Sequence, residues 1–175
     1  MKAMLHPKIE NALNAQLARE SAASSNYLAM AVWCDQRSLD GCARFFYRQA
    51  DEERMHMMKI LHYLIECNAA AEVPGLPKPA AAFQSVQQVF HSALEQEQAV
   101  TRSINELVEL AQECSDHSTQ HFLQWYVGEQ REEEATVTKI LDRIRLIGEG
   151  SMSLYYIDSE VEKINAQVLA SETGA

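Results

Sequence analysis

Polar side chains that can bind metal ions interrupt the buried faces expected from the sequence. Alternating steps of four and three residues keep side chains on one face of a helix, and four long stretches carry mostly apolar residues at that spacing. Each stripe is broken near its middle, by Glu20, Glu53, His56, Glu97, Gln130 and Glu133. Buried carboxylates repel one another and are costly to desolvate, whereas two divalent cations neutralise four of them. Oxygen ligands with one imidazole suit iron or manganese. The pattern therefore predicts a site for two metal ions.

The stretches that carry these residues are predicted to be long helices. The chain has only four prolines and six glycines, most of them in segments 73–79 and 148–150, so an all-α fold is expected. Ser38 and Ser85 are the expected N-caps of the second and third helices, and Ser115 or Asp116 that of the fourth. We expect helices over about 7–36, 39–67, 86–113 and 117–147, and a shorter fifth helix over about 154–168.

The connections predict how these helices are arranged. The first and second helices, and the third and fourth, are joined by a few residues, so each pair should form an antiparallel hairpin. The Ala/Pro-rich linker of about 68–84 reaches ~55 Å when extended. A 30-residue helix is ~45 Å long. The linker can therefore cross the whole bundle and make the second and third helices parallel.

In this arrangement the six polar residues fall at one height. Thirty-three residues separate Glu20 from Glu53, and the same number separates Glu97 from Gln130. With a rise of ~1.5 Å per residue, all six lie within about one helical turn of a common level. A hydrogen-bonded buried network with some protonated glutamates is the alternative, and a lone E-x-x-H is a weak signal. Six residues related by a two-fold repeat favour the di-metal site.

Composition limits the classes of partner. The formal net charge of −10 argues against binding nucleic acid or anionic membranes and suits a protein that handles cations. No stretch approaches the ~20 apolar residues of a membrane span, and the N-terminus has no apolar leader segment. The four scattered cysteines form no C-x-x-C motif. We interpret them as reduced thiols of a cytoplasmic protein.

Two motifs resemble those of the bacterial non-haem ferritins. The stronger spans 122–134 and reads FLQWYVGEQREEE; the second spans 51–56 and reads DEERMH. The similarity extends over about residues 5–165. It implies one ferritin-like domain over 1–175: a four-helix bundle over about 7–147, with a long crossover between the second and third helices and a short C-terminal fifth helix.

The resemblance also implies roles for individual residues. Glu20, Glu53 and His56 would hold a first iron, and Glu53 would bridge to a second iron bound by Glu97 and Glu133, with Gln130 beside it. A third, outer iron site would use Glu52, Glu129 and Glu132, for which a solvated helix surface is the alternative. Tyr27 would adjoin the di-iron centre and supply an electron, or simply pack in the core.

This chain differs from related di-iron families at two positions, and these differences bear on how it binds the second iron and whether it binds haem. Many di-iron bundles repeat E-x-x-H on the fourth helix, whereas this chain has Gln130 and Glu133 there. An amide is the weaker ligand, so a looser second iron is expected. Bacterioferritins carry a haem-ligating Met immediately after the first E-x-x-H glutamate, and this chain has Arg54. No haem is therefore expected.

The function expected from this resemblance is iron storage. Fe(II) would be oxidised by dioxygen or peroxide at the di-iron centre, and ferric mineral deposited inside a homo-oligomeric shell of 24 subunits. One alternative is a di-iron or di-manganese oxidoreductase of the rubrerythrin or oxygenase type. Others are a DNA-protecting ferritin relative and an iron-buffering shell without turnover.

Overall fold

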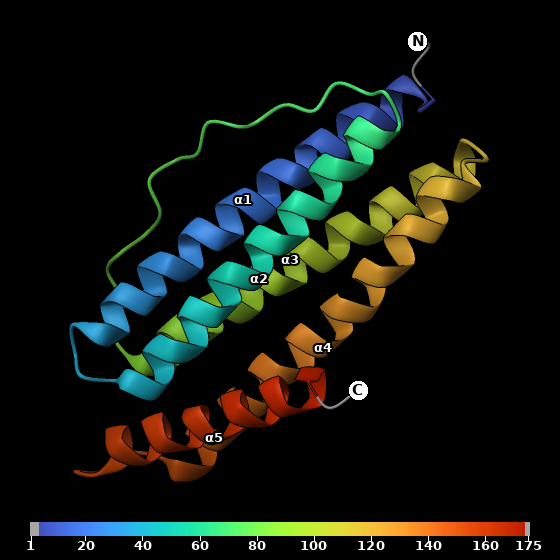
Figure 1. Ribbon diagram of the computed structural model, residues 1–175. Coiled ribbons are helices and arrows are strands. Elements are labelled where there is room, and N and C mark those ends of the chain that lie inside the picture. The colour runs from blue at the N-terminus through green and yellow to red at the C-terminus, as the bar shows by residue number, and fades with distance from the viewer. Residues whose placement is uncertain (1–3, 174–175) are drawn as a thin grey trace.

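Five helices make up the described part of the chain, residues 4–173 of a computed structural model, and within that range no strand occurs. They are α1 (Pro7–Asp35), α2 (Asp40–Glu66), α3 (Val86–Glu113), α4 (His117–Ile147) and α5 (Ser153–Thr173). Figure 1 shows α1 and α2 as one hairpin and α3 and α4 as another. The linker between α2 and α3 runs along the outside of the bundle, so α2 and α3 are parallel. The predicted four-helix bundle with a long crossover is confirmed.

The helix ends follow local capping chemistry, with one correction. Pro7 occupies the first turn of α1, where its missing N–H is no loss. Ser85 and Asp116 cap α3 and α4 by accepting from backbone N–H groups, as expected. The prediction that Ser38 caps α2 is wrong. Ser38 adopts a left-handed conformation with φ 56° in the turn, and Leu39 takes the cap position without a side-chain hydrogen bond.

The fifth helix is longer than predicted and lies against the bundle. It ends at Thr173 rather than near 168, and it packs on α2 and α4 (Figure 1). Asp158 anchors it, because its carboxylate accepts from the backbone N–H groups of Gly41 (3.0 Å) and Cys42 (2.8 Å) at the start of α2. A Cβ on Gly41 would lie 2.4 Å from the carbonyl oxygen of Asp158, so α5 approaches α2 closely only because residue 41 is glycine.

Two apolar clusters fill the bundle interior. One surrounds Phe45, Phe46 and Phe90 towards the α1–α2 turn. The other contains Leu13, Leu17 and neighbouring apolar residues towards the opposite end. The polar residues at the predicted common level lie between these clusters. Within the described residues, no helix has the length and apolar character needed to cross a membrane.

Candidate metal centre

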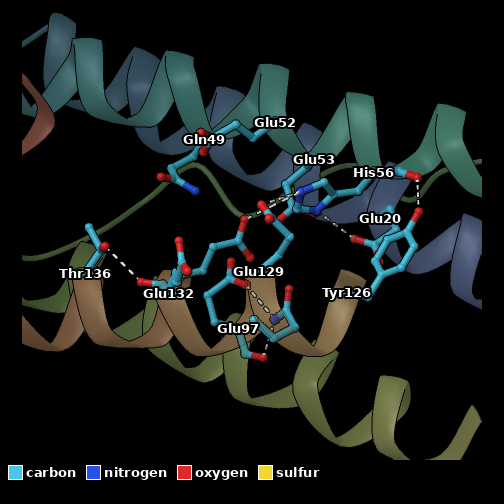
Figure 2. Close-up of polar contacts among 12 residues, drawn as sticks. Glu20, Gln49, Glu52, Glu53, His56, Glu97, Tyr126, Glu129, Glu132 and Thr136 are labelled. Carbon is cyan, nitrogen blue, oxygen red and sulfur yellow. Dashed lines mark hydrogen bonds and ion pairs between the residues drawn. The ribbon is translucent and has the colours of Figure 1, made fainter. Parts of the chain in front are cut away.

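The six polar residues singled out from the sequence come together in the bundle interior. Glu20 comes from α1, Glu53 and His56 from α2, Glu97 from α3, and Gln130 and Glu133 from α4; together we call them the inner centre. All six side chains are buried, and Glu20, Glu53 and Glu97 are 0% exposed. Figure 2 shows Glu20, Glu53, His56 and Glu97 pointing towards one another from three helices.

Two groups of three ligands share one glutamate. One oxygen or nitrogen atom from each of Glu20, Glu53 and His56 lies within 4.8 Å of the others, and the same holds for Glu53, Glu97 and Glu133. The imidazole Nδ1 of His56 is 3.9 Å from a Glu20 oxygen and 3.7 Å from a Glu53 oxygen. Its Nε2 is 3.8 Å from Glu133. Glu53 is therefore placed to bridge two metal ions.

Most potential ligand atoms of the inner centre make no hydrogen bond to the described residues. Within residues 4–173, both carboxylate oxygens of Glu53 and both imidazole nitrogens of His56 are buried without a hydrogen bond. One side-chain oxygen each of Glu20, Gln130 and Glu133 is likewise buried without a hydrogen bond. Buried polar groups are normally satisfied, and leaving one unpaired costs roughly 1–3 kcal/mol. The oxygens and one imidazole nitrogen fit a pair of divalent cations as ligands, while the other nitrogen of the neutral imidazole carries its hydrogen.

Neighbouring side chains hold Glu20 in place. Gln16, one turn earlier on α1, donates from its amide to Glu20 (2.8 Å), and Ser103 of α3 hydrogen-bonds to the Gln16 carbonyl oxygen. Sequence reasoning missed both residues. Gln16 lies off the apolar stripe and Ser103 is an ordinary serine, so only the α1–α3 interface shows their role. The signal that was present is the i, i+4 pairing of an amide with a core glutamate.

Glu97 and His56 are held in a similar way. Tyr27 donates its hydroxyl to Glu97, which places this tyrosine beside the inner centre, as expected from the sequence. The amide nitrogen of Gln130 donates to the other Glu97 oxygen (3.1 Å), so Gln130 positions a ligand as well as presenting its own carbonyl oxygen. The Tyr126 hydroxyl donates to the backbone carbonyl of His56 (2.8 Å).

Burial shifts the protonation of the inner centre. Desolvation is the largest cause in each case: it raises the pKa of Glu20, where hydrogen bonds oppose it, and the pKa of Glu53 and that of Glu133 lie well above the ordinary value. Repulsion from the neighbouring carboxylate of Glu97 adds to the shift in all three. Desolvation also lowers the pKa of His56 to about 4. The imidazole is therefore neutral near pH 7, which is the form that binds metal.

A second group of acids lies beside the inner centre. Glu52 of α2 and Glu129 and Glu132 of α4, here the outer cluster, line a cavity of about 280 Å³ together with Glu133. Glu129 reaches the inner centre, with an oxygen 4.0 Å from Nε2 of His56. Figure 2 shows the outer cluster on the side of His56 away from Glu20.

The bundle and its buried carboxylates define a class of protein, the di-metal carboxylate helical bundles. Residues 10–147 match the model of the ferritin-like domain. The chain is 42% identical to the "Bacterial non-heme ferritin" of Campylobacter jejuni over 92% of this chain and 96% of that one. It is 35% identical to the Escherichia coli O6:H1 protein of the same name, over 94% and 99%.

Comparison with solved structures also identifies ferritins as similar proteins. An open-pore ferritin from Archaeoglobus fulgidus superimposes with a TM-score of 0.87 at 36% identity, over 90% of this chain and 98% of that one. The chain therefore belongs to the ferritin family, with the bacterial non-haem ferritins.

Proposed function

We propose that this ferritin binds two Fe(II) ions in the inner centre, one between Glu20, Glu53 and His56 and one between Glu53, Glu97 and Glu133. The protein is an iron-storage ferroxidase, as its family membership indicates. The observation that carries the residue assignment is the pair of three-ligand groups sharing Glu53, whose own buried oxygens accept no hydrogen bond in the described part of the chain.

The iron ions, the glutamates and the side chains around them have different roles in the proposed oxidation. The two Fe(II) ions supply two electrons, and dioxygen or peroxide is the proposed acceptor. The glutamates neutralise the metal charge, and the two apolar clusters keep bulk water out of the site. Hydrogen bonds from Gln16 and from Tyr27 hold Glu20 and Glu97 in their positions before metal arrives. Loss of a hydrogen bond that orients a metal ligand commonly changes metal affinity or activity by about 10–100-fold.

We further propose that the outer cluster is a third iron site and a route for ferric product. The cavity that it lines includes Glu133, so it adjoins the proposed second iron. Glu132 is 73% exposed, so the cluster leads from the buried centre to the surface of the bundle. Glu129, close to His56 and facing the same cavity, lies between the two sites.

Storage requires an enclosed space, which one bundle cannot supply. Members of the family assemble as multimeric shells, and we propose a shell of 24 subunits and a cytoplasmic location for this chain. The mass of the native particle tests the stoichiometry. A particle of a few subunits would instead favour a di-iron oxidoreductase.

The assignment is tested by loading metal-free protein with Fe(II) without oxygen and then mixing it rapidly with dioxygen. A fast absorbance phase should saturate at two irons per subunit. Glu53→Gln should abolish this phase, while Glu66→Gln, an exposed change on the same helix, should leave it intact. No saturable phase in the wild type would favour an iron-buffering shell. A normal phase in Glu53→Gln would refute the assigned ligands.

A further inference from the structure

A continuous series of aromatic rings leads from His56 towards the α3–α4 turn. Trp125 meets His56 edge-on, with ring centroids 5.2 Å apart, and Tyr126 lies 4.8 Å from Trp125. Phe122 is 5.5 Å from Tyr126, and Tyr63 stacks on Phe122 at 3.9 Å with an interplanar angle of 9°. Figure 2 shows the near end of this series, where Tyr126 points at the backbone of His56. The steps are short enough for electrons to pass between rings in contact.

Tyr63, at the far end of the series, has a pathway for its proton. Its hydroxyl is 3.0 Å from Oγ1 of Thr119, and that hydroxyl donates to a carboxylate oxygen of Asp116 (2.7 Å). Because the Thr119 proton is committed to Asp116, Tyr63 must be the donor in its own hydrogen bond. A phenol that loses an electron also loses its proton, and here one hydroxyl connects it to a carboxylate.

The phenols nearer to the metal lack an equivalent proton acceptor. Tyr27 donates to Glu97, whose oxygens are proposed to bind iron, and Tyr126 donates to a backbone carbonyl, which is not a base. Burial raises the pKa of Tyr63 to about 12, so the phenol holds its proton near pH 7 until it is oxidised. Asp116 lies outside both iron sites and remains available when metal is bound.

Lys59 makes Trp125 a poor place for positive charge to remain. Its ammonium nitrogen lies 4.3 Å from the centre of the Trp125 ring. A cation over an indole face is attracted to the electron-rich ring and repelled by a ring that has lost an electron. The positive charge of Lys59 therefore disfavours an oxidised Trp125. Oxidation of Tyr63 is favoured instead, because Tyr63 can transfer its proton to an acceptor.

We propose that Tyr63 is an electron donor to the inner centre through Trp125, Tyr126 and Phe122, with Thr119 and Asp116 accepting its proton. The proposal rests on the proposed function. Its oxidant is hydrogen peroxide meeting a subunit that holds a single Fe(II). Reducing peroxide to two waters needs two electrons; Fe(II) gives one and Tyr63 the other.

The step balances as Fe(II) + H₂O₂ + Tyr63–OH + H⁺ giving Fe(III) + 2 H₂O + Tyr63–O•. The O–O bond breaks, and the phenolic O–H bond breaks as its proton passes through Thr119 to Asp116. Two protons from solvent complete the waters, and Asp116 later returns one. Without the second electron, one-electron reduction of peroxide would release a hydroxyl radical. Tyr63 would thus protect the protein during incomplete loading.

The test is rapid-freeze electron paramagnetic resonance of the assembled protein, loaded anaerobically with one Fe(II) per subunit and mixed with hydrogen peroxide. Wild type should give a tyrosyl radical. Tyr63→Phe should lose at least half of the signal, whereas Tyr156→Phe, an exposed tyrosine on α5, should keep it. Asp116→Asn retains an acceptor for the helix cap but no base, so it should lower the radical yield and increase hydroxyl radical captured by a spin trap.

Results that contradict the role of Tyr63 differ from results that contradict the proposed function. A signal of equal size in Tyr63→Phe and Tyr156→Phe would overturn the proposal, as would a wild type without a tyrosyl radical. Fast oxidation of two Fe(II) by dioxygen, measured on the same samples, should be unchanged in Tyr63→Phe because the metals then supply both electrons. Absence of that fast phase in the wild type would instead refute the proposed function.

Discussion

The inner centre, which draws residues from α1 to α4, lies beside the outer cluster of α2 and α4, and the two groups differ in burial and in neighbouring positive charge. Glu53 is 0% exposed, and its two carboxylate oxygens accept no hydrogen bond from the described residues. Glu52, the next residue before it, is ion-paired with Arg48 one turn earlier on α2. The helix α2 therefore presents Glu53 to the core and Glu52 to an accessible cavity that the guanidinium of Arg48 also lines.

This difference shows how a protein can place carboxylates for two tasks. In the inner centre, hydrogen bonds reach Glu20 and Glu97, but the buried oxygens of Glu53 accept none, so protons or metal ions must offset its desolvation and the repulsion from its neighbours. In the outer cluster, solvent and Arg48 relieve the charge without metal. We therefore expect the outer cluster to bind metal more weakly than the inner centre and to exchange it more readily, as a site on the proposed route of ferric product should.

The largest expected effect comes from removing the shared ligand. Glu53→Gln should slow the fast oxidation phase by at least about 100-fold, because it weakens both iron positions at once. Glu132→Gln should change that phase by less than about two-fold and slow only later turnovers. Stopped-flow absorbance over successive iron additions measures both. Equal effects of the two changes on the first turnover would erase the distinction between the two groups.

Removing a supporting hydrogen bond should have a smaller effect. Gln16→Leu takes away the amide that orients Glu20, so anaerobic Fe(II) affinity at the first position should fall by about 10-fold. Gln112→Leu, an exposed change on α3, is the matched control. Titration calorimetry of metal-free protein gives both affinities. An unchanged affinity in Gln16→Leu would show that Glu20 needs no such support.

Proton release should accompany metal binding to the inner centre. The raised pKa values of Glu20, Glu53 and Glu133 keep protons on these carboxyls at pH values above the ordinary value of 4.5. Metal must displace these protons, so affinity should fall as the pH is lowered, by about ten-fold per unit for each proton displaced. His56, with its pKa of about 4, contributes nothing to this until the pH approaches that value.

Calorimetry in two buffers of different ionisation enthalpy measures the protons released. Heats that do not depend on the buffer would contradict the raised pKa values. Glu53→Gln should release fewer protons than the wild type.

The smallest expected effect concerns the countercharge of the outer cluster. Arg48→Gln removes the cation paired with Glu52, so divalent metal should bind the outer cluster about two- to five-fold more tightly, as for a partly exposed ion pair. Arg44→Gln is a close control, because Arg44 is ion-paired with Glu162 of α5 away from the cluster. Competition with a chromophoric chelator measures the change. Weaker metal binding in Arg48→Gln would show that the arginine organises the site.

The bundle and the inner centre were predictable because both follow from periodicity. The four-and-three spacing places Glu20 and Glu97 on core stripes, and the equal 33-residue separations place them at one height with residues of α2 and α4. The structure brings these residues together as predicted; their iron-binding roles are still a prediction. The Asp116 cap was among the two alternatives left by the sequence.

The features that escaped prediction depend on contacts between helices. Ser38 is a good N-cap by type, yet the tight α1–α2 turn needs a left-handed residue at that position. The docking of α5 depends on Asp158 meeting the start of α2 and on the absence of a Cβ at Gly41. The hydrogen bond between Gln16 and Ser103 likewise depends on how α1 packs against α3.

The most direct test of the shared ligand is anomalous diffraction from crystals soaked in Fe(II) without oxygen. Two iron peaks should appear in each bundle, one beside Glu20 and His56 and one beside Glu97 and Glu133, with Glu53 between them. A weaker third peak at the outer cluster should appear only at higher iron concentration. A single inner peak, or occupation of the outer cluster before the inner centre, would contradict the account.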